Sequence, residues 1–239
     1  LEMLRQPFTS IDIILYDIID LLLVAQSELA GFWLRATLEG VDPEPAGNWP
    51  RWLSALPAQI DLTHITALRM RLDASHAFWP AVLAPMAKLE ELNVALGSPC
   101  EGSDTDPLPI VVLCTALAQE PLLCPALHTL RVEWPVPSAA PGADDMGVPR
   151  IADMLAVREG LGRRRPDRLA VRMPTKPELV EKTLGETDVL RGLVRACECV
   201  LRADEHAFEL EEEEVWWEVD ADAEEYWEKG AASRPDYKL

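Results

Sequence analysis

The stretch that decides the fold is Lys88-Leu89-Glu90-Glu91-Leu92-Asn93-Val94-Ala95-Leu96. In its second half Leu92, Val94 and Leu96 are apolar and are separated by single residues, one of them the polar Asn93. A two-residue period is that of a β-strand with one buried face, because successive side chains of a strand point to opposite faces. Leu89 adds an apolar position three residues before Leu92. The stretch therefore predicts a short strand packed on one side against a core.

The same spacing of apolar residues recurs along the chain, at intervals of 21 to 39 residues. Clear copies are Phe8, Ile11, Ile13, Leu15; Leu29, Phe32, Leu34, Ala36; Ile65, Leu68, Met70, Leu72; and Leu127, Leu130, Val132, Trp134. Weaker copies are Pro166, Leu169, Val171, Met173 and Val194, Cys197, Cys199, Leu201. The pattern is that of the strand segment of leucine-rich repeats. It predicts an α/β, irregular leucine-rich-repeat-like solenoid over residues 1–202, with parallel strands on the concave face and helices outside.

Helices are expected between these strands. Their predicted positions are Ile18 to Ser27, the turn around Trp49 to Leu56, Ser75 to Ala87, Ile110 to Gln119, a segment from Ile151, and Val189 to Val194. A doubly wound sheet is covered on both faces, so its strands read as continuous apolar runs. Most of the strands predicted here alternate instead, which favours one open face.

Residues 203–239 form an acidic C-terminal tail or cap, with 14 acidic and 3 basic residues in a chain of net charge −19. So acidic a chain repels polyanions, which argues against nucleic acid and anionic membranes as partners. Trp216, Trp217 and Trp227 in this segment either cover the end of the array or attract a partner. We favour a cap, since the terminal repeat of a solenoid needs cover.

The sequence contains no motif that indicates catalysis. It has no phosphate-binding loop, nucleophile elbow or His-Glu-x-x-His zinc motif. Cys197-x-Cys199 with His206 lacks the four ligands of a closed structural zinc site. We therefore predict a non-enzymatic protein without metal or cofactor, and keep an α/β enzyme without a recognisable motif as a remote alternative. Five cysteines without disulfide spacing, and no run of about 20 apolar residues, predict a cytoplasmic or nuclear protein.

Arginine is concentrated at the strand positions that alternate with the buried ones. The two predicted outward columns are Asp12, Trp33, Arg69, Asn93, Arg131, Ala170 and Ile14, Arg35, Arg71, Ala95, Glu133, Arg172. Guanidinium groups match carboxylates and phosphates, so the concave face is predicted to bind an acidic or phosphorylated protein segment. The predicted partner-binding residues are Trp33, Arg35, Arg69, Arg71, Asn93, Arg131, Glu133 and Arg172. Two alternatives are that these arginines pair with Glu133 and Asp12, and that the chain's own acidic segment covers them.

Two segments resemble pieces of fungal F-box proteins that carry degenerate leucine-rich repeats. These are Leu123-Cys124-Pro125-Ala126-Leu127-His128-Thr129-Leu130 and Ala152-Asp153-Met154-Leu155-Ala156-Val157-Arg158. The acidic ending with Val215-Trp216-Trp217-Glu218 and Glu225-Tyr226-Trp227 is similar as well, so the resemblance covers most of residues 60–228.

The resemblance implies the substrate receptor of a Skp1–cullin–F-box ubiquitin ligase, whose F-box binds Skp1 and whose repeats hold the target. The first 60 residues contain no Leu-Pro-x-Glu-Leu-type F-box start, and the chain opens at Leu1. We therefore expect a fragment that lacks an upstream F-box, so that Skp1 is a partner only if that F-box exists. The alternative is a leucine-rich-repeat scaffold with no role in ubiquitin transfer.

Overall fold

The computed structural model describes residues 7–16, 20–27, 31–37, 48–72, 78–96, 109–121, 123–133, 147–162, 165–174 and 180–202. The chain divides into two units, Leu1–Asp204 and Glu205–Leu239. All described residues belong to the first unit. The expectations for the acidic segment 203–239, including its three tryptophans and His206, lie outside them.

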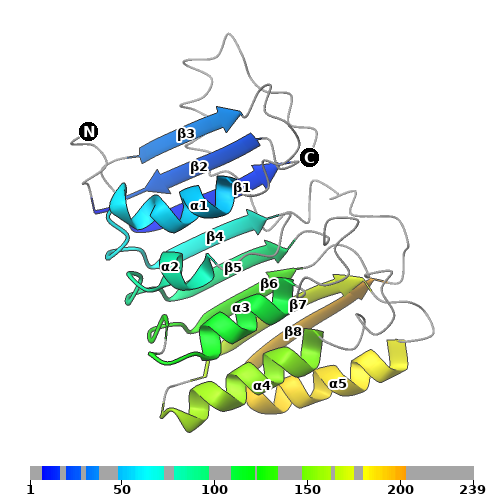
Figure 1. Cartoon of the computed structure of the whole chain (residues 1–239). Coiled ribbons are helices and arrows are strands. Elements are labelled where there is room, and N and C mark those ends of the chain that lie inside the picture. Colours follow the sequence, from blue (N-terminus) through cyan, green and yellow to red (C-terminus); the bar gives the residue numbers. More distant parts are fainter. Residues whose placement is uncertain are drawn as a thin grey trace. The chain divides into compact units, whose positions relative to one another are not determined.

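The first unit is an α/β structure built on one sheet (Figure 1). Within the described residues the strands are β1 Ser10–Tyr16, β2 Asp20–Gln26, β3 Gly31–Thr37, β4 Ala67–Leu72, β5 Glu91–Leu96, β6 Thr129–Glu133, β7 Arg168–Pro174 and β8 Ala196–Arg202. The helices are α1 Asn48–Ala55, α2 Trp79–Leu83, α3 Pro109–Ala118, α4 Gly147–Gly160 and α5 Val180–Leu193, with the 3₁₀ turn η3 Leu56–Ala58. The strand order is β3-β2-β1-β4-β5-β6-β7-β8, so the sheet is open, with β3 and β8 at its edges.

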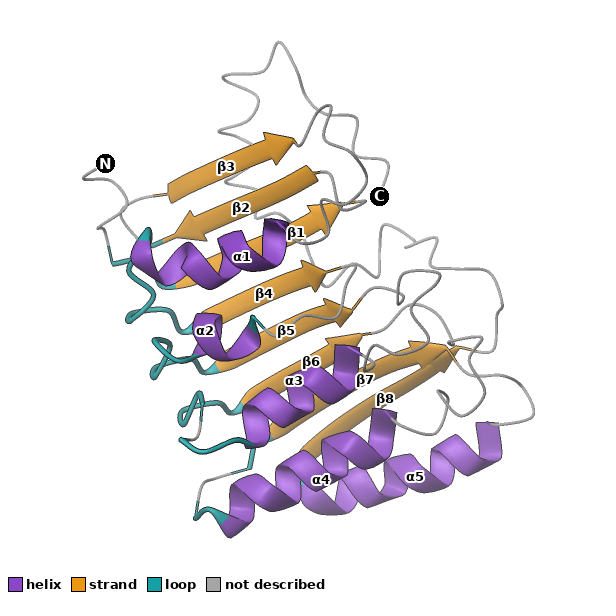
Figure 2. Cartoon of the chain, in the orientation of Figure 1, coloured by secondary structure: helices purple, strands orange, loops and turns teal. Residues whose placement is uncertain are grey.

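Most of the sheet is parallel. Strand β1 pairs with β4, and each strand from β4 to β8 pairs in parallel with the next one along the chain. Each of these connections contains a described helix, and Figure 2 shows α1 to α5 on the same side of the sheet. The chain therefore adds one strand and one helix at a time in the same direction from β4 onward.

The start of the sheet differs from the sequence-based prediction. The segment Ile18 to Ser27 was predicted to be helical, but it contains strand β2, which runs antiparallel to both β1 and β3. Consequently the strand predicted at Leu29–Ala36 is the antiparallel edge strand β3, and β1 rather than β3 lies beside β4. The reason is that Leu22 and Val24 are as apolar as Leu21 and Leu23. The run shows no alternation and fits a helix as well as a strand.

The remaining predicted elements are present with shifted ends. Helices lie at the predicted turn near Trp52, at Ile110, at Ile151 and at Val189. Helix α2 is much shorter than the predicted Ser75 to Ala87. It ends at Leu83, with Pro85 two residues later, and a proline cannot continue a helix. Residues 73–77 of that prediction lie outside the described part of the chain.

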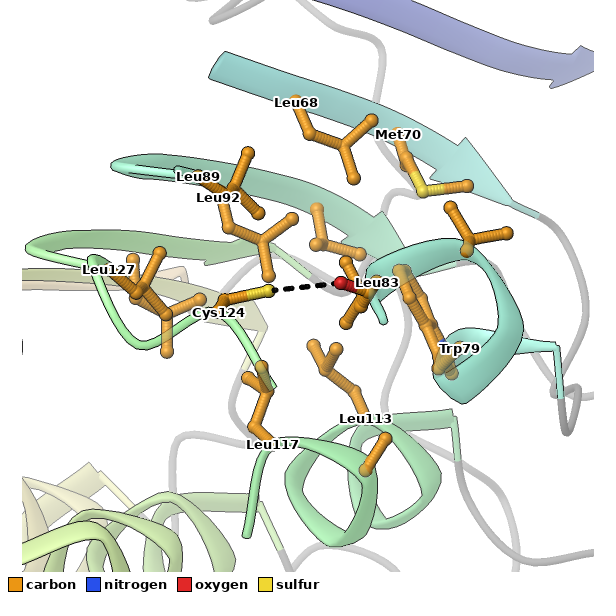
Figure 3. Packing of buried hydrophobic residues seen from close by; sticks show 14 of the residues in the cluster. Leu68, Met70, Trp79, Leu83, Leu89, Leu92, Leu113, Leu117, Cys124 and Leu127 are labelled. Atoms are coloured by element: carbon orange, nitrogen blue, oxygen red, sulfur yellow. Dashed lines mark hydrogen bonds between the residues drawn. The ribbon is translucent and has the colours of Figure 1, made fainter. Parts of the chain in front are cut away.

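The core lies between the helices and the sheet face that they cover (Figure 3). Strands contribute alternate residues such as Leu68, Met70 and Leu92, and α2 contributes Trp79; all four are at most 1% exposed. The alternation that defined the sequence pattern is therefore the alternation between the buried face and the opposite face. We call the face opposite the helices the outer face.

The same turn precedes three of the parallel strands. A buried residue accepts a hydrogen bond through its carbonyl from the amide three residues later, and that later residue is the first apolar position of the sequence pattern. The bonds are Ile65 N to Leu62 O (3.3 Å), Leu89 N to Met86 O (3.1 Å) and Leu127 N to Cys124 O (3.1 Å). In addition, one main-chain carbonyl at the start of each of β1, β4 and β5 accepts hydrogen bonds from two successive main-chain amides at the start of the neighbouring strand. The acceptors are Thr9 for Thr66 and Ala67, Thr66 for Glu90 and Glu91, and Glu90 for His128 and Thr129.

Candidate functional site

The strand register places the eight predicted partner-binding residues in two rows across the sheet. The first row is Trp33, Val24, Asp12, Arg69, Asn93, Arg131, Ala170, Glu198, and the second is Arg35, Leu22, Ile14, Arg71, Ala95, Glu133, Arg172, Val200. Both predicted columns are therefore rows of the sheet, with one residue of β2 inserted in each. The side chains of Trp33, Arg35 and Arg71 lie outside the described part of the structure.

Arg69 binds a carboxylate of its own chain. Its Nε donates to Asp12 Oδ1 at 2.6 Å, and its Nη2 donates to the other carboxylate oxygen of Asp12. The two side chains are only 23% and 13% exposed, so water competes weakly for this contact. Arg69 thus has an ion-pair partner within the sheet, as one alternative expected, and its charge is partly neutralised before any partner arrives.

Asn93 and Glu133, which were predicted to contact a partner, are nearly inaccessible. Asn93 is 5% exposed and Glu133 is 4% exposed, although both stand on the outer face. Arg131 and Arg172, the register neighbours of Asn93 and Glu133, are partly buried. Arg131 and Arg172 thus have the same intermediate exposure as Arg69, and Asn93 and Glu133 lie beside them in the register.

A hollow of about 440 Å³ lies among the strands β6, β7 and β8. It is lined by Thr129, Arg131, Arg168, Leu169, Ala170, Ala196, Cys197 and Glu198. Six of the eight lining residues occupy two adjacent rows of the outer face, which are Thr129–Arg168–Ala196 and Arg131–Ala170–Glu198, and the other two, Leu169 and Cys197, form the register pair between these rows. The hollow forms because Ala170 and Ala196 have short side chains, whereas their neighbours in the same rows have long ones.

The sequence-based prediction missed Arg168 and Glu198, both exposed on the outer face. The signal was present, because Arg168 lies two residues before Ala170 and Glu198 lies between the two cysteines of the last weak repeat copy. Adding the preceding outward position of β7 would have found Arg168, and continuing the first column into β8 would have found Glu198.

The paired cysteines of β8 occupy the opposite face from Glu198. Cys197 and Cys199 are free thiols with their sulfur atoms 3.5 Å apart, and both pack against the core. Burial raises the pKa of the Cys199 thiol to about 12, so this thiol is protonated and a weak nucleophile at neutral pH. Within the described ranges, no three His, Cys, Asp or Glu side chains converge in a way that could hold a metal ion.

Comparison with family models, curated proteins and solved structures finds no match for this chain. The described helices include none that is both long and apolar enough to cross a bilayer.

The segments 123–130 and 152–158 contact each other directly. Arg158, from the second segment, is fully buried, and its guanidinium donates to the carbonyl oxygens of Leu123 at 3.0 Å and Cys124 at 2.8 Å in the first segment. It also donates to the carbonyl of Leu117 at 3.1 Å, at the end of α3. One arginine thus joins α3, α4 and the turn that leads into β6.

Proposed function

We propose that the chain is a leucine-rich-repeat-like solenoid that acts as a protein-interaction module without catalytic activity. Three observations support the repeat character. Strands β4 to β8 are neighbours in sequence order, their helices lie on one face, and the entries of β4, β5 and β6 share the same turn and main-chain bonds. Such arrays leave one sheet face available for binding.

The partner in this proposal is an acidic or phosphorylated protein segment that lies on the outer face. The observation that carries the proposal is the charge of this face. Although the whole chain has a net charge of −19, the strand positions that share this face in the register hold seven arginines against five acids. The arginines are Arg35, Arg69, Arg71, Arg131, Arg168, Arg172 and Arg202, and the acids are Asp12, Asp20, Glu91, Glu133 and Glu198. Guanidinium groups held on a rigid sheet can donate two parallel hydrogen bonds to a carboxylate or phosphate.

We further propose that this module is the target-binding part of an F-box-type ubiquitin-ligase receptor in the cytoplasm or nucleus. Support comes from the resemblance of residues 123–130 and 152–158 to fungal F-box proteins and from the contact of these segments through Arg158. Skp1 would bind only through an F-box encoded upstream. A pull-down of Skp1 with the product of the full coding sequence separates this role from that of a scaffold unconnected with ubiquitin.

The binding face is tested with a short fluorescein-labelled glutamate-rich peptide, measured by fluorescence anisotropy at low and at physiological salt. Replacing Arg131 and Arg172 together with alanine should weaken binding by about five- to tenfold and flatten its salt dependence, since exposed ion pairs contribute up to about 1 kcal/mol each. A phosphoserine peptide of the same net charge shows which anion is preferred.

The matched control removes the same charge from the helix side of the sheet. Arg150 in α4 and Arg191 in α5 are exposed, and their double alanine variant should bind the peptide as the unchanged chain does. Equal losses in the two double variants would mean that only net charge matters, and the proposed face would be wrong.

A further inference from the structure

The hollow over β6, β7 and β8 carries two opposite charges at diagonal corners. In the parallel register Arg168 lies opposite Ala196, and Glu198 lies opposite Ala170. The two charged side chains therefore stand on neighbouring strands, offset by two residues, and the two alanines occupy the other corners. Arg131 lies beside Ala170 on the third strand and adds a second guanidinium to the same hollow.

Arg168 and Glu198 are both available to a ligand. Both are exposed, and neither forms an ion pair with another residue in the described part of the chain. Asp12 and Arg69 behave differently, because they are directly opposite each other in the register and bind each other. Adjacent strands lie about 4.8 Å apart and two residues of a strand span about 6.6 Å, so the diagonal between the Cα atoms of Arg168 and Glu198 is about 8 Å.

An extended peptide presents charges at a similar spacing. Its residues i and i+2 point to the same side and lie about 6.6 to 7 Å apart. An acidic residue at one of these positions can reach Arg168 and Arg131 while a basic residue at the other reaches Glu198. A second carboxylate in the place of the basic residue would meet Glu198 and be repelled, and repulsion of this kind is a common source of specificity.

We propose that this hollow recognises an acid–x–base tripeptide within an extended protein segment. The acidic side chain binds the guanidinium of Arg168, with Arg131 beside it, and the basic side chain binds the carboxylate of Glu198. This inference rests on the proposed function and adds a selection rule to it. The outer face as a whole attracts acidic segments, and the hollow selects those in which an acidic residue and a basic residue alternate.

The test compares labelled peptides of identical composition in which Glu-Ala-Lys, Lys-Ala-Glu or Glu-Lys-Ala is placed at the centre of the same glutamate-rich sequence. The first two put both charges on one side of an extended peptide, in either chain direction, and the third puts them on opposite sides. The chain should bind the better of the first two about two- to fivefold more tightly than the third, as expected for one exposed ion pair. Glu198→Gln should abolish this preference.

A charge reversal makes the test specific for Glu198. Glu198→Lys should prefer a peptide with glutamate in the place of the lysine, whereas Asp153→Lys, which makes the same change at an exposed position of α4, should keep the original preference. Circular dichroism confirms that each variant is folded.

The possible failures are distinguishable. If peptides bind through Arg131 and Arg172 but Glu198 variants keep the original preference, the selection rule is wrong and the proposed function stands. If no acidic peptide binds the unchanged chain, both the selection rule and the proposed function are wrong.

Discussion

Arg158 lies in an environment that is unusual for an arginine. Arginine is rarely fully buried, yet Arg158 is 0% exposed and its guanidinium donates to the carbonyls of Leu117, Leu123 and Cys124. Cys124 has a φ of 49°, in the left-handed region that residues with a side chain seldom adopt. The guanidinium therefore holds an unfavourable turn in place by binding carbonyls that no helix or strand satisfies.

Replacing Arg158 with methionine should destabilise the fold by about 3 kcal/mol. Methionine fills much of the same volume, but it removes the donor to the carbonyls of Leu117 and Leu123, at a cost of about 1–3 kcal/mol for each buried carbonyl left without a donor. The carbonyl of Cys124 keeps its hydrogen bond from the Leu127 amide. Urea denaturation followed by circular dichroism measures the change. Arg150→Met, at an exposed position of the same helix, is the control and should have little effect. Equal stability of the two variants would show that the hydrogen bonds of Arg158 do not hold the turn.

Strands β1 and β4 are adjacent in the sheet although they are far apart in the sequence. They are parallel neighbours, but the antiparallel strands β2 and β3 lie between them in the sequence. Besides the parallel pairing of Ser10–Ile14 with Ala67–Arg71, the described contacts between them include the main-chain bonds from Thr66 and Ala67 to the carbonyl of Thr9 and the ion pair of Asp12 with Arg69. The ion pair is directly across the strands and partly buried, so it fixes the register of a pairing that the chain order does not enforce.

A double-mutant cycle should therefore find coupling between Asp12 and Arg69. Asp12→Asn, Arg69→Met and the double variant are compared with the unchanged chain by urea denaturation. We expect an interaction free energy of about 1–2 kcal/mol, above the range for fully exposed pairs because both side chains are mostly buried. Additive effects of the single variants would contradict this assignment.

At the scale of the whole molecule, the described strand pairings and the described core all lie within residues 8–202. The first unit, Leu1–Asp204, therefore contains the complete sheet of the described chain. The acidic segment contributes much of the net charge of −19 but none of these pairings.

A chain shortened after Asp204 should keep a single cooperative unfolding transition and the circular dichroism of a mixed α/β protein. The reason is that cooperative unfolding requires an intact core and an intact sheet, both of which this part supplies. Thermal unfolding of the shortened and full chains gives the comparison. A broad, non-cooperative transition in the shortened chain would show that residues 205–239 are required for the fold.

Most of the sheet can be predicted from the sequence, because a strand with one buried face has apolar residues at every second position. Leu68 and Met70, or Leu92 and Val94, are buried where the pattern places them, and the register aligns Arg69, Asn93 and Arg131 as expected. The prediction fails at β2, where Leu21 to Ala25 is apolar at every position and a two-residue period is invisible. Antiparallel pairing there also depends on contacts between strands, which no local pattern encodes.

The candidate site is predictable in position and less so in detail. The outward columns follow from alternation alone, but which charged residues stand directly opposite each other depends on the strand register. Arg69 stands directly opposite Asp12, whereas Arg168 and Glu198 stand diagonally, offset by two residues. The hollow itself arises from two alanines on adjacent strands, and their proximity is a property of the sheet rather than of either segment.

Main-chain bonds join successive strand entries at Thr66, Glu90 and His128, where side-chain contacts from Thr66 to the Thr9 carbonyl and from His128 to Glu90 add to them. The side chains at these positions can therefore change without removing the main-chain bonds between neighbouring strands. A fold of this kind can exchange the chemistry of its exposed rows while its spacing is preserved. The same framework can in this way evolve toward many different targets.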